Sequence, residues 1–147
     1  MKMFARLTGT VAILALLVGV GTYMLAPDTF EDLFADARDR TTGSAIRIAA
    51  ANARRDLPRD LNEGTTLVDV QAEGQVLVFL ADISMVIPPA AHAEFAEANA
   101  DALRRQMCSQ DRIRALFRTG ISFRYDYRDA TGMRIAQIPI DSAVCAQ

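Results

Sequence analysis

Apolar and polar residues alternate along residues 121–128, which is the pattern of a strand with one buried face. The predicted buried face holds Ile121, Phe123, Tyr125 and Tyr127, and the opposite face holds Ser122, Arg124, Asp126 and Arg128. Asp129 to Gly132 supplies a turn, because Asp can bond the backbone ahead of it and Gly accepts positive φ. A second strand then runs from Met133 to Ile140. The pattern predicts a β-hairpin.

An earlier stretch predicts a second hairpin. Residues 65–72 alternate, Glu73-Gly74 forms a tight turn, and residues 75–83 return as a strand rich in Val, Leu and Phe. A connector from Met85 to Pro89 follows, and its two prolines exclude it from a central strand.

Helical spacing predicts the remaining elements. A short amphipathic helix carries Phe30, Leu33, Phe34 and Ala37 at i, i+3, i+4 and i+7. The other helices run from Ala45 to about Asp56, from about Ala90 to Met107, and through Ile113, Leu116 and Phe117 to a stop at Gly120. Antiparallel hairpins with segregated helices indicate an α+β, two-layer domain. We therefore predict a four-stranded antiparallel sheet made of two hairpins with helices on one side, preceded by an N-terminal apolar helix.

The amino-terminal segment predicts export. Lys2 and Arg6 precede an uncharged run from Leu7 to Pro27, and Asp28 follows, which places the amino end in the cytoplasm and the rest outside. The run is near the roughly 20 residues of a membrane-spanning helix, whereas the apolar core of a secretory signal has about 7–15. We expect an uncleaved inner-membrane anchor. The alternative is a signal cleaved near Gly19-Val20-Gly21, which leaves a soluble periplasmic protein.

These features divide the chain into three parts. Residues 1–27 are the signal-anchor or signal peptide, residues 28–43 an amphipathic helix and linker, and residues 44–147 a periplasmic α+β domain. Cys108 and Cys145 are the two cysteines, and cysteines of an exported chain pair in the oxidising compartment. We predict a structural disulfide between them, because a redox pair usually has C-x-x-C spacing.

Composition and charge narrow the function further. The net charge of −2 argues against nucleic acid as a partner, since phosphate binding needs a surplus of cations. The one histidine, His92, lies at the expected start of a helix, where capping explains it better than a catalytic triad. No group of residues has zinc-binding spacing, so we expect no catalytic site, no metal and no cofactor.

Two blocks of the chain from Asn52 to Cys145 resemble a family of small, mostly uncharacterised exported proteobacterial α/β domains with one disulfide. The first block holds Asn52 to Pro58, Thr66-Leu67-Val68 and Gly74. The second holds Cys108, Arg114-x-Leu116-Phe117, Gly120-Ile121, Tyr125-x-Tyr127-x-Asp129, Gly132 and Cys145. The architecture is similar to one class of type II secretion pilotins. Pilotins are lipoproteins, but no cysteine comes directly after the apolar segment of this chain.

We expect a non-enzymatic periplasmic domain, tethered to the inner membrane, that binds or positions another envelope protein. The alternatives are a pilotin-like secretion assembly factor and a hydrolase or enzyme inhibitor with an unrecognised site. The candidate partner-binding residues are Phe30, Leu33, Phe34, Arg104 and Arg105. The three apolar residues lie on the helix nearest the anchor, which either packs on the domain or exposes a hydrophobic groove for an amphipathic helix. The two arginines open a basic run that continues to Arg118.

Overall fold

The computed structural model describes residues 42–147. The predicted apolar anchor and the amphipathic helix with Phe30, Leu33 and Phe34 lie outside the described residues. No helix within residues 42–147 has both the length and the apolar character needed to cross a membrane.

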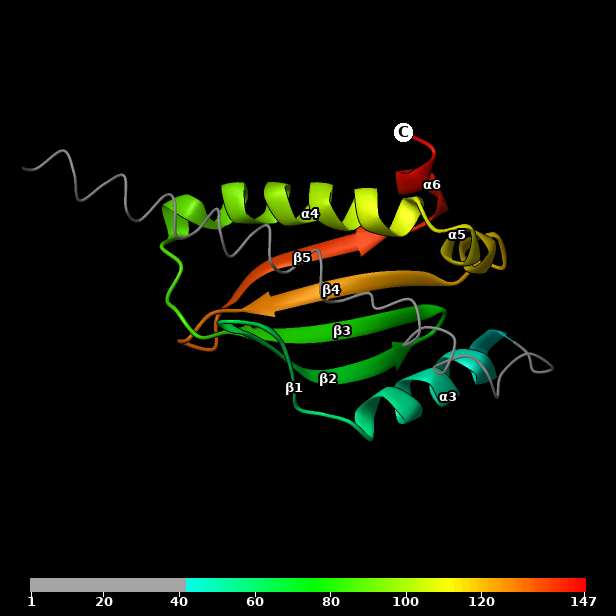
Figure 1. Ribbon diagram of the computed structural model, residues 1–147, viewed down its shortest axis with the longest axis horizontal. Helices are drawn as coiled ribbons and strands as arrows, with labels where there is room; N and C mark the ends of the chain where they lie inside the picture. Colours follow the sequence, from blue (N-terminus) through cyan, green and yellow to red (C-terminus); the bar gives the residue numbers. More distant parts are fainter. Residues whose placement is uncertain (1–41) are drawn as a thin grey trace, which may run out of the picture.

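The described residues form two groups of strands with helices before, between and after them (Figure 1). In chain order the elements are α3 (Thr42–Arg54), β1 (Arg59–Asn62), β2 (Thr65–Glu73), β3 (Val76–Ile83), the 3-10 helix η2 (Pro89–Ala91), α4 (His92–Cys108), α5 (Asp111–Arg118), β4 (Ser122–Arg128), β5 (Arg134–Ile140) and α6 (Ser142–Cys145). The predicted α+β class is confirmed. The helix α5 ends where expected, since Gly120 follows it with a φ of 90°.

The sheet differs from the prediction in strand number and direction. It has five strands within residues 42–147, in the order β1-β2-β3-β4-β5, and it is mixed. Both predicted hairpins are antiparallel, but β3 and β4 pair in parallel, from Val76 opposite Ser122 to Asp82 opposite Arg128. The prediction of an all-antiparallel, four-stranded sheet was wrong. The helices between β3 and β4 carry the chain back to the end where β3 starts, and such a crossover connection suits parallel pairing.

Strand β1 is the additional strand. It has four residues, and it pairs only with the first residues of β2, across the turn at Glu63-Gly64. Its sequence, Arg59-Asp60-Leu61-Asn62, has one buried apolar residue, Leu61. Four residues with one apolar position are too few to show the period of two that identifies a strand.

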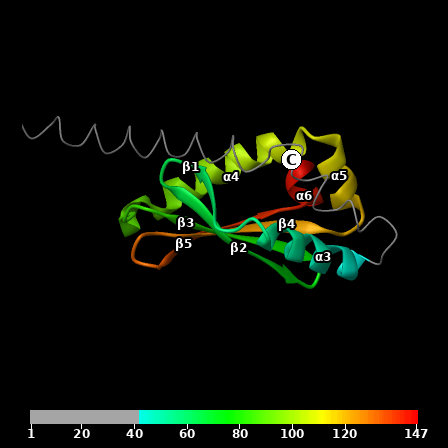
Figure 2. The ribbon, with the colours of Figure 1, turned by 60° about the horizontal axis from the view of Figure 1, so that its bottom comes forward.

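Helices α3, α4 and α5 share one hydrophobic core with one face of the sheet. Ile46 of α3, Leu103 of α4 and Ile113 of α5 belong to the same buried cluster as Leu77 and Tyr125 of the central strands. Helix α4 lies along β5 and α3 lies along β2 (Figures 1 and 2). This arrangement buries the central strands and leaves the outer edge of β5 beside α4.

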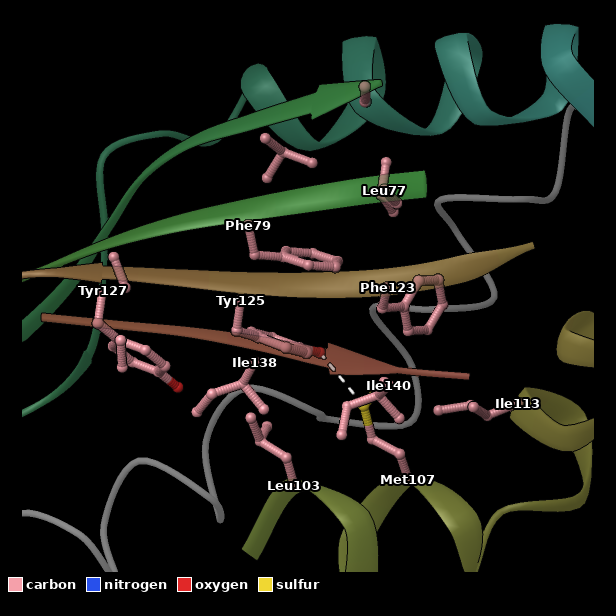
Figure 3. Close-up of a cluster of buried hydrophobic side chains, with 14 of the residues drawn as sticks. Leu77, Phe79, Leu103, Met107, Ile113, Phe123, Tyr125, Tyr127, Ile138 and Ile140 are labelled. Carbon is pink, nitrogen blue, oxygen red and sulfur yellow. Dashed lines mark hydrogen bonds between the residues drawn. The ribbon is translucent and has the colours of Figure 1, made fainter. Parts of the chain in front are cut away.

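The tyrosines of β4 lie on the buried face, as the alternation predicted. Tyr125 and Tyr127 are both fully buried. Tyr125 stacks on Phe79 at 4.9 Å and its hydroxyl donates to the sulfur of Met107 at 3.4 Å (Figure 3). Burial raises the pKa of both phenols above the ordinary value of 10.0. Both residues are therefore part of the core.

The opposite face of the sheet carries ion pairs. Arg124 bridges Glu73 on β2, at 2.9 Å, and Asp126 on its own strand, at 3.0 Å. Arg128 pairs with Asp82 of β3 at 2.8 Å. The mixed charge predicted for this face is thus largely internally paired, and Asp126 is only 8% exposed. Paired charges attract a charged partner less than isolated charges do.

Candidate functional site

A groove runs between helix α4 and strand β5 and ends at α6. Its volume is about 390 Å³. The apolar floor consists of Ala96, Ala100, Ile138, Ile140 and Val144. The polar and charged side chains of the lining are those of Glu97, Asp101, Arg104, Gln137 and Gln147. A small apolar floor with a polar rim suits side chains of a partner segment.

The sequence of α4 explains why the groove exists. Phe95, Asn99, Leu103 and Met107 recur every four residues and are buried under the helix. Ala96 and Ala100 stand one residue after the first two of these, on the flank that faces β5. Because alanine fills little space, this flank of the helix leaves a hollow over the edge of the sheet.

Strand β5 forms an edge of the sheet, since among residues 42–147 it pairs only with β4. Pro139 lies opposite Arg124 near the end of this pairing. Proline has no amide hydrogen, so an added strand would meet one missing donor along the outer edge of β5. Edge prolines discourage strand addition. The groove therefore favours a partner held by side-chain packing over one held by a full β-ladder.

The two arginines predicted to bind a partner take different places. Arg104 lines the groove, 3.5 Å from the carboxylate of Asp101 one turn earlier. Arg105 is exposed and lies outside the groove lining. The floor residues Ala96, Ala100, Ile138 and Val144 were missed by the sequence analysis. For Ala96 and Ala100 the sequence holds one signal: they lie four residues apart, each directly after a buried residue of α4.

His92 and Asp126 are each engaged by neighbouring residues. His92 is the first residue of α4, and its Nε2 lies 2.8 Å from the carbonyl oxygen of Ile87. Within residues 42–147, no three His, Cys, Asp or Glu side chains gather closely enough to hold a metal ion. The buried carboxylate of Asp126 is engaged by Arg124 and Gln137.

The predicted disulfide is confirmed. Cys108, the last residue of α4, is bonded to Cys145, the last residue of α6, with their Cα atoms 5.3 Å apart. A second, smaller hollow of about 230 Å³ lies beside this bond, between α5 and α6. It contains Arg114 and Arg118 of the predicted basic run. Arg114 is paired with Asp111, which reduces the positive charge there.

Asp129 organises the β4–β5 turn and the connector after β3. Its carboxylate accepts hydrogen bonds from the hydroxyl and the N–H of Thr131, at 2.5 and 2.9 Å, and from the N–H of Ile87, at 3.3 Å. The residue is 5% exposed. Mainly because of the bond from the Thr131 hydroxyl, the pKa of Asp129 lies below its ordinary value of 3.8. The carboxylate holds two loops together.

This geometry predicts a pH-dependent difference between the parent and an Asp129→Asn variant. The folded-state pKa is below the unfolded-state value, so the carboxylate stabilises the fold above about pH 4, and this contribution is lost as the pH falls through the folded-state pKa. The variant should melt below the parent at pH 7, and the gap in Tm should narrow as the pH falls below about 4. Thermal melts over this range measure it. A gap that stays constant with pH would show that the charge of Asp129 contributes nothing.

Comparisons with known proteins place this fold. No protein-family model and no curated protein matches the chain. Among solved structures, a protein described as secreted, from Pseudomonas aeruginosa, is 24% identical with a TM-score of 0.56, and the match covers 71% of this chain and 92% of that one.

Two pilotins have similar structures. The type II secretion pilotin of Vibrio vulnificus is 12% identical with a TM-score of 0.57, over 78% of this chain and 96% of the pilotin. The type II secretion pilotin of Vibrio cholerae is 16% identical with a TM-score of 0.54, over 79% and 98%. The resemblance drawn from the sequence motifs is thus confirmed at the level of architecture: the chain has a fold similar to those of a secreted Pseudomonas protein and of type II secretion pilotins.

Proposed function

We propose that this chain is a non-enzymatic, exported domain of the cell envelope that binds a segment of another envelope protein in its α4–β5 groove, as a pilotin-like assembly factor of a type II secretion machine. The observation that carries the proposal is the groove itself, with its floor of Ala96, Ala100 and Ile138 beside the edge strand β5. The N-terminal run from Leu7 to Pro27 is the proposed tether to the inner membrane.

The chemistry of the groove defines what it can hold. The floor is aliphatic and shallow, so it accepts small or branched apolar side chains along one stripe of a segment. The charged groups of the rim are Glu97, Asp101 and Arg104, which can bond polar side chains on the flanks of that stripe. An amphipathic segment supplies both features at once.

The absence of enzymatic activity is part of the proposal. The charges that line the groove are those of Glu97, Asp101 and Arg104, and Arg104 lies within ion-pair distance of Asp101. The lining holds no serine, cysteine or histidine, so it offers neither of the usual nucleophiles of acyl transfer nor the histidine base that activates them. Two structures of similar fold are those of pilotins, which adds support for a role in secretion.

The groove can be tested by filling it. Ala100 lies half-buried in the floor, so Ala100→Trp should block the groove and weaken partner binding at least tenfold, while the Tm stays within about 4 °C of the parent. Ala115→Trp, on the exposed surface of α5, is the matched control and should bind like the parent.

The measurement is a pull-down from detergent-solubilised envelopes, followed by titration of the captured protein against each variant. We expect a component of the type II secretion machine to be captured by the parent and by Ala115→Trp. If Ala100→Trp captured as much of this protein as the parent does, the groove would have no part in the interaction. Capture through the groove of a protein from outside the secretion machine would reject the pilotin-like role while leaving the groove as a docking site.

A further inference from the structure

Two large hydrophobic side chains are exposed in the part of the chain that the structure describes. They are Val86, 59% exposed, and Met133, 57% exposed. Val86 lies in the connector between β3 and α4, and Met133 lies in the turn between β4 and β5. In Figures 1 and 2 these two loops lie side by side, at the end of the domain away from α5 and α6. We call Val86, Pro88 and Met133 the apolar tip; Pro88 is also exposed.

Hydrogen bonds on both sides of Val86 join the two loops. The N–H of Ala130 donates to the carbonyl oxygen of Met85 at 3.1 Å, and the N–H of Ile87 donates to the carboxylate of Asp129 at 3.3 Å. The N–H of Asp129 donates to the carbonyl oxygen of Met133 at 3.0 Å. Val86 and Met133 therefore lie on two loops that hydrogen bonds hold together.

Further contacts fix the backbone of the connector around Val86. Ile87 is buried and its carbonyl oxygen bonds His92, so the connector is fixed directly after Val86. Pro88 and Pro89 then restrict the backbone up to the start of η2. A surface whose backbone is already fixed loses little conformational entropy when a partner binds it.

We infer that the apolar tip is a second protein-binding surface, separate from the α4–β5 groove, and that it takes a protein patch in which an apolar cluster adjoins a carboxylate. The carboxylate follows from Arg134, which comes directly after Met133, is exposed, and has no ion pair with another described residue. Methionine adapts its shape to irregular apolar partners. Protein–protein interfaces are enriched in methionine and arginine relative to the rest of the surface.

The composition and the place of the tip favour a protein over a lipid surface. Segments that dock on membranes carry Trp or Tyr at the interface and clusters of Lys or Arg, but residues 84–90 and 129–135 hold no aromatic residue and one Arg. In addition, α3 begins at the opposite end of the domain, near α5 and α6 (Figures 1 and 2). The chain that precedes residue 42 therefore joins the domain at the end away from the tip.

The test uses the full chain in its own envelope, with the photocrosslinking residue p-benzoylphenylalanine at position 86 or at position 133. Position 115, an exposed Ala on α5, is the control. We expect both tip positions, but not position 115, to form a discrete adduct with the same protein, identified by mass spectrometry. Met133→Asp should abolish the adduct formed from position 86.

Titration of the purified captured protein then measures how tightly the apolar tip binds it. Met133→Asp should weaken binding at least tenfold, and Ala143→Asp, an exposed change on α6, should leave it unchanged. Arg134→Ala should weaken binding at 50 mM salt, and the difference should fade at high salt because ions screen exposed charges. Crosslinking to phospholipid, crosslinking to a second copy of this chain, no adduct, or full binding by Met133→Asp would each overturn the inference. Ala100→Trp changes only the groove and Met133→Asp only the apolar tip. The two variants therefore test the proposed function and this inference separately.

Discussion

We expect the Cys145→Ser variant to unfold at least about 15 °C below the parent. The disulfide joins residues separated by 37 positions, and the chain-entropy relation for such a loop gives about 4 kcal/mol of stabilisation at 25 °C. A domain of about 100 residues loses roughly 4–8 °C of Tm for each kcal/mol, so the entropic loss alone accounts for the expected shift. The loss is a large fraction of the 5–15 kcal/mol that stabilises a domain of this kind.

The disulfide also holds α6, which is too short to persist alone. This helix has four residues, and its described cap is the bond from the N–H of Val144 to the carboxylate of Asp141, at 2.9 Å. Isolated helices shorter than about 12–15 residues are marginal in water. Val144 and Gln147 line the end of the groove, so release of Cys145 should also weaken binding there.

Thermal melts should give the same low Tm for Cys145→Ser and for the parent with reductant, and a higher Tm for the parent without reductant. Ala146→Ser, an exposed change next to Cys145, is the control and should melt with the parent. A Cys145→Ser variant that melts within a degree of the parent would show that α4 and α6 stay together without the bond.

Local pattern predicted the elements with strong periodicity. The buried face of β4 was predicted residue by residue, since Phe123, Tyr125 and Tyr127 are all buried, and both hairpins form as expected. The pairing of one hairpin with the other was not predictable in the same way. Alternation reports which face of a strand is buried, but it does not report the direction of the neighbouring strand. The crossover through α4 and α5 decides that direction.

The site was less predictable than the fold, for a physical reason. A groove exists where side chains are small, so the residues that create it, Ala96 and Ala100, show in sequence only as favourable helix formers. The sequence analysis placed the partner surface on large apolar residues and arginines instead. Of these, Arg104 lines the groove and Arg105 does not, while Phe30, Leu33 and Phe34 lie outside the described residues.

The second large effect is expected in the aromatic cluster that joins α5 to the sheet. Phe123 of β4 is fully buried and meets Phe79 of β3 edge-on at 5.8 Å and Phe117 of α5 at 5.3 Å. Replacing a buried Phe with Ala costs about 3–5 kcal/mol through lost transfer energy and the remaining cavity. We expect Phe123→Ala to lose about 4 kcal/mol, comparable to the loss of the disulfide.

The loss should be cooperative, because the same ring contacts a central strand and the helix that precedes β4. Urea unfolding should show a lower midpoint with an unchanged slope, which is the mark of a stability change without a change in the extent of unfolding. Phe123→Leu is the matched control: it keeps most of the buried volume but removes the ring contacts, and it should lose well under half as much. If Phe123→Ala cost less than about 1 kcal/mol, surrounding side chains would have to close the cavity. The packing of α5 on the sheet would then depend on Ile113 and Phe117, which are both buried, and would not need the ring of Phe123.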